Sequence, residues 1–137
     1  MDRSLVLIKP DAVERNLIGK IISCYENKGL KIVALKMEKA SKEVAEKHYA
    51  EHKEKVFYDE LINFITRSPL CVMIIEGDNA IETIREINGS TNPLEAKYGT
   101  IRRAFAVNKT ENCVHASDSL DSAKREIDTW FPELNLN

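Results

Sequence analysis

Two uninterrupted apolar runs constrain the fold of this chain more than any other feature of its sequence. They cover residues 5–8 and 70–75, so each is as long as a β-strand and far shorter than a membrane span. Pro10 lies just after the first run and suits the first turn of a helix, and Gly77 begins a turn after the second. Apolar runs without polar alternation are typical of buried strands.

The other segments alternate between strand and helix patterns. Strand patterns cover residues 5–8, 30–37 and 70–75, and a last strand is expected from residues 105–107 together with the segment leading to His115. Helices are expected from Pro10, around residues 21–25, after Ser41, and over residues 61–65, 81–87 and 120–130. This order predicts an α+β protein with the ferredoxin-like β-α-β-β-α-β sandwich, an antiparallel four-stranded sheet covered by helices.

Length and composition indicate one folded domain over residues 1–137. The hydrophobic fraction of 43% and charged fraction of 31% are those of an ordinary globular chain. The formal net charge of -2 excludes a global field that attracts nucleic acid or membranes. However, five basic and two acidic residues lie between Arg85 and Lys109, a local charge of +3 that fits either an anion site or a solvated loop.

The compartment and one long loop can also be inferred. The N-terminus lacks the long apolar region of a signal peptide, and the three cysteines are far apart, which predicts a cytoplasmic protein with free thiols. Residues 90–100 show no periodicity, and a loop of that length inside a small domain suggests a functional role.

The first of two histidine motifs is the H-x-x-E-H segment at residues 48–52, which has the form of an inverted zinc-protease motif. On a helix, His48 and His52 would share a face. A catalytic zinc site also needs a third ligand, and the sequence does not identify one. We interpret the segment as a polar surface helix and keep a metal hydrolase as the alternative.

The second histidine motif is Asn-Cys-Val-His-Ala-Ser-Asp at residues 112–118. The small Ala116 leaves the imidazole of His115 approachable. From spacing alone, His115 is either a structural residue near a strand end or a nucleophile. The motif itself leaves both interpretations open.

Residues 112–118 resemble the N-x-x-H-[GA]-S-D signature of the nucleoside diphosphate kinase family. The family's I-K-P-D, G-x-T-N-P and G-T-I-R elements are matched at residues 8–11, 89–93 and 99–102, and the resemblance extends from Leu5 to Phe131. It implies a ferredoxin-like fold that acts on nucleoside triphosphates and diphosphates with Mg²⁺. No side chain is expected as a dedicated metal ligand, because the nucleotide phosphates mainly hold the ion.

The resemblance also implies a mechanism. His115 would accept the terminal phosphate as a phosphohistidine and pass it to a second nucleotide, which is ping-pong covalent catalysis. Glu126 and Ser117 would set the tautomer of the imidazole. Lys9 and Tyr49 would lie near the transferred group.

The nucleotide-binding residues follow from the same resemblance. Lys9 and Asn112 would reach the ribose hydroxyls, and the phosphates would bind a further set of residues: Arg85, Thr91 and Arg102. Phe57 would stack on the base beside the apolar Leu61. Stacking does not distinguish bases, so we expect broad base specificity.

The family pattern is not matched everywhere. Tyr98 stands where the family usually has proline, and Arg103-Ala104 where it often has Gly-Asp. Lys109 occupies a position that is often apolar, and we exclude it from the site. Resemblance also implies a homo-oligomer, a tetramer or hexamer built from dimers.

Two other classes of function remain open. A ferredoxin-like RNA-recognition domain would need exposed aromatic residues on its strands and a basic face. Aromatic residues make up 7% of the chain, and the apolar strands are expected to be buried. A regulatory protein that keeps the kinase fold is the other alternative, although His115, Lys9 and Arg102 are all present.

Overall fold

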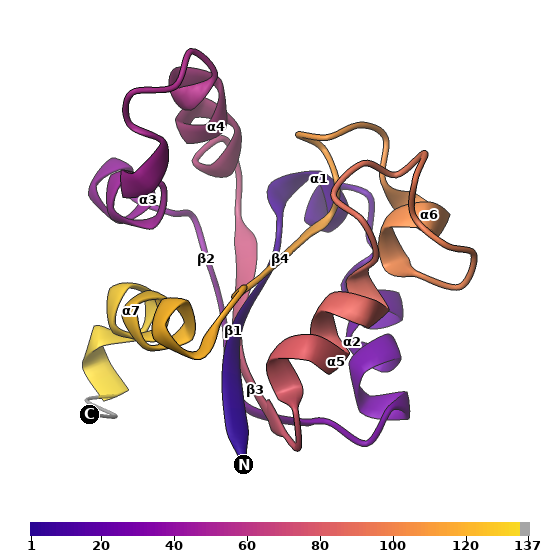
Figure 1. Ribbon diagram of the computed structural model, residues 1–137. Helices are drawn as coiled ribbons and strands as arrows, with labels where there is room; N and C mark the ends of the chain where they lie inside the picture. The colour runs from indigo at the N-terminus through magenta and orange to yellow at the C-terminus, as the bar shows by residue number, and fades with distance from the viewer. Residues whose placement is uncertain (135–137) are drawn as a thin grey trace.

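A four-stranded antiparallel sheet forms the centre of the computed structural model, which describes residues 1–134. Its strands are β1 (Asp2–Ile8), β2 (Lys31–Glu38), β3 (Leu70–Gly77) and β4 (Val114–Ala116). They lie in the order β2-β3-β1-β4, and each neighbouring pair is antiparallel (Figure 1). The predicted ferredoxin-like α+β fold is confirmed.

Helices cover both faces of this sheet. The helices are α1 (Pro10–Glu14), α2 (Ile18–Asn27), α3 (Lys42–His48), α4 (Tyr58–Ile65), α5 (Ala80–Asn88), α6 (Ile101–Phe105) and α7 (Leu120–Trp130), and 3₁₀ turns cover Ala50–His52 and Pro132–Leu134. In Figure 1 the sheet is seen edge-on, with α2 and α5 on one side and α3 and α7 on the other.

The alternation of side chains along β1 explains the apolar runs. Val6 and Ile8 pack in one buried cluster with residues of α2 and α5, whereas Leu5 and Leu7 pack in a second cluster with Trp130 of α7. Strand β3 is divided between the two clusters in the same way. An antiparallel sheet with both faces covered needs apolar residues at every position. The covered faces of β1 and β3 therefore do not offer the aromatic platform of an RNA-recognition domain.

The last strand differs from the prediction. Residues 105–107 are not a strand, because Phe105 ends α6, and β4 is limited to Val114–Ala116. Thr100 caps α6 by accepting a hydrogen bond from the backbone N–H of Arg103. After α6, the side chain of Asn108 accepts hydrogen bonds from two backbone N–H groups of a turn. The apolar segment is therefore followed by a turn instead of a sheet pairing.

The loop predicted over residues 90–100 contains neither helix nor strand. Gly89 begins it with a φ of +85°, a conformation that favours glycine. A Cβ atom at this position would meet the side chain of Thr100 at 2.5 Å, so the two ends of the loop approach closely. Among the described residues, no helix is both long and apolar enough to cross a membrane.

Candidate active site

A cavity of about 580 Å³ opens beside β4. Every residue predicted for the site lines this cavity except Ser117, which is buried behind Glu126. The lining residues from that prediction are Lys9, Tyr49, Phe57, Leu61, Arg85, Thr91, Arg102, Asn112, His115 and Glu126. They come from strands, helices and the long loop, so only the fold brings them together.

Strand β4 holds His115 opposite Leu7 of β1. The Nε2 atom of His115 lies 2.8 Å from Oε1 of Glu126, and the hydroxyl of Ser117 donates to the same oxygen at 2.8 Å. Since the carboxylate can only accept, Nε2 carries the proton of the neutral imidazole of His115, and Nδ1 keeps the lone pair. The neutral ring therefore offers a nitrogen without a proton on a histidine that lines the cavity.

His48 is a buried residue of the same site, which contradicts the prediction of a surface helix. Its Nδ1 accepts a hydrogen bond of 3.1 Å from the indole N–H of Trp130. Its ring lies edge-on to His115, with the ring centroids 4.5 Å apart. Burial, and next His115, lower the pKa of His48 well below its usual value, so the ring stays neutral. Docking of α7 against α3 buries it.

The H-x-x-E-H segment does not form one ligand set. Helix α3 ends at His48, and His52 lies in the separate 3₁₀ turn, so the two do not share a helical face as expected. Potential ligand atoms of His48, His115 and Glu126 do lie within 4.8 Å of one another. However, Nδ1 of His48 already accepts from Trp130, which leaves Nε2 protonated and unable to bind a metal. This geometry disfavours a zinc hydrolase.

Lys9 places a buried ammonium group in the cavity. Its Nζ donates to Oδ1 of Asn112 at 2.9 Å, and the amide nitrogen of Asn112 donates to the backbone carbonyls of Lys109 and Thr91. Desolvation, and next the charge of Arg102, lower the pKa of Lys9 to about 8. An anion bound beside Lys9 would stabilise its charged form.

Arg102 is fixed by the backbone on both sides. Its two Nη atoms donate to the carbonyls of Gly89 and Val114, each at 2.8 Å. Its Nε atom is buried and has no hydrogen-bond partner among the described residues. Burial lowers the pKa of Arg102, yet an arginine remains charged at neutral pH. The guanidinium is therefore a positioned cation with an unused donor.

Aromatic residues line another part of the cavity. Phe57 is 42% exposed, and the neighbours of its ring are the ring of His52 at 5.8 Å and the Nζ of Lys55 at 5.5 Å. Tyr49 packs edge-on to His48, with 4.7 Å between the ring centroids. Burial raises the pKa of Tyr49, so its hydroxyl remains a hydrogen-bond donor.

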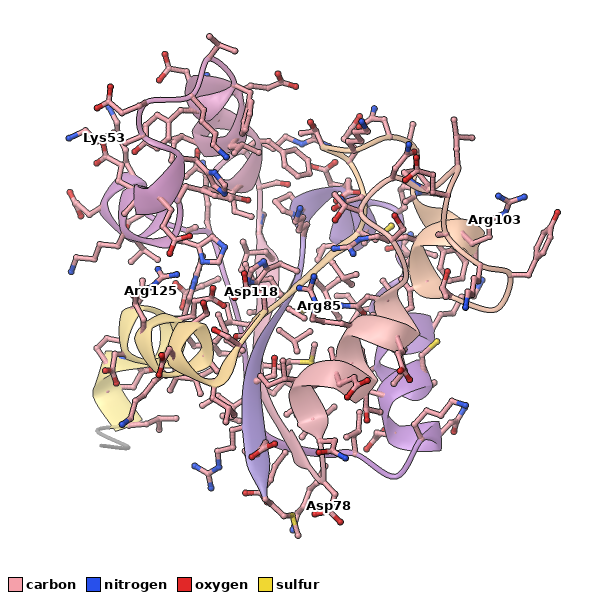
Figure 2. The ribbon with its side chains drawn as sticks, in the orientation of Figure 1. Lys53, Asp78, Arg85, Arg103, Asp118 and Arg125 are labelled. Atoms are coloured by element: carbon pink, nitrogen blue, oxygen red, sulfur yellow. The ribbon has the colours of Figure 1, made fainter. Side chains whose placement is uncertain are left out.

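The structure adds lining residues that sequence reasoning missed or set aside, namely His48, Lys109, Asp118 and Arg125. In Figure 2, Arg125 on α7 and Arg85 on α5 flank Asp118. A hydrogen bond from Ser122 holds the pKa of Asp118 below its usual range. Asp118 is the last residue of the histidine motif, and Arg125 directly precedes Glu126. Their closeness in sequence to predicted site residues is the signal that could have identified them.

The two departures at residues 98 and 103 contact each other. The guanidinium of Arg103 lies 4.4 Å from the ring centroid of Tyr98, and its Nη1 donates to the carbonyl of Leu94 at 3.3 Å. Arg103 lies on the outer side of α6, away from Arg85 and Arg125 (Figure 2). The contact between Tyr98 and Arg103 therefore stabilises the long loop from outside the cavity.

Comparison with known proteins agrees with this geometry. The family described as nucleoside diphosphate kinase matches residues 2–136. A nucleoside diphosphate kinase of Clostridium perfringens is 60% identical over 134 residues, which cover 98% of this chain and 94% of that protein. One of Saccharolobus islandicus is 52% identical over 136 residues, 99% of each. The crystal structure of the Aquifex aeolicus nucleoside diphosphate kinase superposes with a TM-score of 0.94 at 38% identity, covering 99% of both chains. The chain therefore belongs to the nucleoside diphosphate kinase family and is an enzyme that transfers phosphate between nucleotides.

Proposed function

We propose that the enzyme moves the terminal phosphate of a nucleoside triphosphate to a nucleoside diphosphate by a ping-pong mechanism through a phosphohistidine on His115. The observation that carries this proposal is the hydrogen bond between Nε2 of His115 and the buried carboxylate of Glu126. It leaves Nδ1 unprotonated, so no separate base is needed.

In the first half-reaction, the lone pair of His115 Nδ1 attacks the terminal phosphorus. The bond between this phosphorus and the bridging oxygen breaks, and the nucleoside diphosphate leaves with the electron pair. A second diphosphate then attacks the phosphohistidine with a terminal phosphate oxygen, and the N–P electron pair returns to Nδ1. Glu126 and Ser117 act throughout as positioning residues that keep the proton on Nε2.

We propose that the cations lining the cavity stabilise the negative charge of the transferred phosphate. The transition state of phosphoryl transfer spreads negative charge over the oxygens, so positioned donors lower its energy. Among the described residues, Nζ of Lys9 donates one hydrogen bond, to Asn112, and keeps two further N–H groups, and Nε of Arg102 is unpaired. We assign Arg85, Thr91 and Arg102 to the phosphates. We place Lys9 and Tyr49 near the transferred group, where Tyr49 would donate its hydroxyl.

The site fits a magnesium ion that arrives with the nucleotide. Mg²⁺ prefers oxygen ligands and usually keeps several waters, so it is bound through one or two carboxylates and the substrate phosphates. Asp118 offers an ionised carboxylate at the cavity, whereas the imidazoles of His48 and His115 are unsuitable ligands for this ion. When bound, Mg²⁺ would neutralise part of the phosphate charge, with Asp118 as the nearby protein oxygen.

Broad base specificity is proposed from the aromatic part of the cavity. Phe57 offers an exposed ring face for a base, and Leu61 lies beside it in the cavity lining. Stacking tolerates every base. Lys9 and Asn112 are assigned to the ribose hydroxyls. Turnover of guanosine, adenosine, cytidine and uridine diphosphates should agree within about tenfold, and a strict preference for one base would contradict the assignment.

The deciding experiment is phosphate trapping. The enzyme is mixed with Mg²⁺ and ATP labelled in its terminal phosphate, and we expect acid-labile label on His115 that an added nucleoside diphosphate removes. The matched control is His115→Asn, which should retain the fold and take up no label. Nucleotide binding without labelling of the wild-type enzyme would indicate a regulatory protein on the kinase fold and would overturn the mechanism.

We also propose that the enzyme is a homo-oligomer built from dimers, either a tetramer or a hexamer. Strand β2 is an edge of the sheet, and its outward residues Val33, Leu35 and Met37 are 38%, 54% and 55% exposed. An exposed apolar edge strand is a surface on which another chain can pair. Sedimentation equilibrium of the wild type and of Leu35→Glu tests this, since the charge should shift the mass toward the monomer.

The chain is further proposed to be a single domain over residues 1–137 that resides in the cytoplasm. Both apolar clusters pack on the same sheet, so neither is expected to fold without the other. Cys24, Cys71 and Cys113 are all free thiols, which suits a reducing compartment. One cooperative unfolding transition, and cytosolic recovery after cell fractionation, are the expected observations.

A further inference from the structure

A strained turn lies just before the strand that carries His115. Cys113 has a φ of +75°, and the Val114 N–H donates to the Asn112 carbonyl at 2.9 Å, which closes a three-residue γ-turn. This turn with positive φ at its centre is rare and strained. The other two non-glycine residues with positive φ among the described residues are asparagines, which tolerate that conformation. Cys113, by contrast, has a side chain that does not suit this conformation.

Residues at the junction between β1 and α1 form hydrogen bonds with both the N–H and the carbonyl of Cys113. The N–H of Lys9 donates to the Cys113 carbonyl at 2.8 Å. The N–H of Cys113 donates to Oδ2 of the Asp11 carboxylate at 3.2 Å. Cys113 and Asp11 are both buried, so water does not replace either bond. Two residues further along, His115 pairs with Leu7 of β1.

We propose that Asp11 is a positioning residue that holds the strained turn at Cys113 and thereby keeps His115 in place for its attack on phosphorus. This inference rests on the proposed phosphohistidine mechanism. Asp11 itself does not line the cavity. Its effect passes through the turn, because a relaxed Cys113 would shift the start of β4 relative to β1.

A second role for Asp11 must be separated from this one. Its charge acts on Lys9 and raises the pKa of that ammonium group, against the larger effect of desolvation. The other carboxylate oxygen, Oδ1, is buried and lacks a partner among the described residues. Asp11→Asn keeps an oxygen that can accept from the Cys113 N–H and removes the charge, so this variant distinguishes the two roles.

The test uses glycine to relieve the strain at Cys113. Glycine adopts positive φ without a steric penalty, whereas alanine keeps the Cβ atom that causes it. Burial raises the pKa of the Cys113 thiol to about 12, so loss of the thiol removes no reactive group. The matched double variants are therefore Asp11→Ala with Cys113→Gly and Asp11→Ala with Cys113→Ala.

Single-turnover phosphorylation of His115 by labelled ATP is measured for all variants, together with the nucleotide KM. Asp11→Ala should slow phosphorylation about tenfold, because Asp11 would no longer offset the backbone strain at Cys113 and His115 would shift from its position. KM should stay within about twofold, because Asp11 does not face the cavity. Asp11→Asn should keep most of the rate. Cys113→Gly should restore the rate of Asp11→Ala, and Cys113→Ala should not.

Each opposite result overturns the inference. An unchanged rate in Asp11→Ala excludes the role, and equal rates for the glycine and alanine doubles exclude the turn as its cause. A slow Asp11→Asn whose pH profile moves to lower pH would assign the effect to the charge on Lys9 instead. If Asp11→Ala alone does not fold, the two doubles still decide. Absence of label on the wild type would reject the proposed mechanism itself, whatever the variants do.

Discussion

The two sides of the cavity differ in the pairing of the polar groups around His115 and around Arg102. On the side of α3 and α7, Glu126 accepts two hydrogen bonds and His48 accepts one from Trp130. On the side of α5, the long loop and α6, the buried Nε of Arg102 has no partner within the described residues. The hydrogen bonds of Glu126 and His48 are therefore in place without substrate, whereas Arg102 keeps a donor available.

This difference matches the two tasks of the proposed mechanism. A nucleophile must keep one tautomer before any substrate arrives, so its hydrogen bonds come from within the protein. Phosphate oxygens are acceptors, and a site for them needs donors that the protein itself leaves free. We therefore expect changes on the α7 side to lower kcat, and changes on the loop side to raise KM.

The largest effect is expected from Arg102→Ala on the loop side. A charge-assisted hydrogen bond contributes roughly 1.5–3 kcal/mol, so kcat/KM should fall about 100-fold, mainly through KM. Steady-state kinetics with several nucleotides measure this. Arg102→Lys is the control, because it keeps the charge and loses the planar fork. A fall confined to kcat would contradict the comparison.

Glu126→Gln tests the α7 side. The amide can rotate and donate its N–H to Nε2 of His115, which would put the imidazole proton on Nδ1 and block the attack. We expect kcat to fall about 30-fold with little change in KM, since disrupting such a buried bond costs roughly 1–3 kcal/mol. Rapid-quench measurement of His115 phosphorylation checks this. An increase in KM alone would place Glu126 in nucleotide binding instead.

The pH dependence of KM should report on Lys9. Because its pKa is lowered to about 8, the ammonium is charged at pH 7 and loses its proton as the pH rises through 8. Nucleotide affinity should be full below pH 7.5 and fall about fivefold to tenfold by pH 9. In Lys9→Gln the affinity should be weak and flat over the same range. A flat profile in the wild type would remove Lys9 from phosphate binding.

The smallest effect is expected from Tyr98→Ala. An exposed cation–π contact such as that between Tyr98 and Arg103 contributes roughly 0.5–1 kcal/mol, so loosening the loop should raise KM about twofold. Hydrogen exchange of residues 90–100 should increase in parallel, and kcat should not change. Faster exchange on α7 instead would show that the two sides of the cavity are not independent.

Local sequence signals predicted most of the secondary structure. The apolar runs gave β1 and β3 because buried strands need no polar alternation, and Ser41 marked the start of α3 by capping it. The strand expected at residues 105–107 was wrong. A short apolar segment is compatible with helix or strand, and Thr100 and Asn108 decided between them through side-chain hydrogen bonds to the backbone.

The sequence by itself determined the family, the fold and which residues could meet at His115, because motifs and apolar patterns are properties of the chain. Only the tertiary structure decided their environment. It buried His48 against Trp130, left Nε of Arg102 unpaired among the described residues, and joined Asp11 to Cys113. These three features depend on contacts between residues far apart in sequence, so no local pattern predicts them.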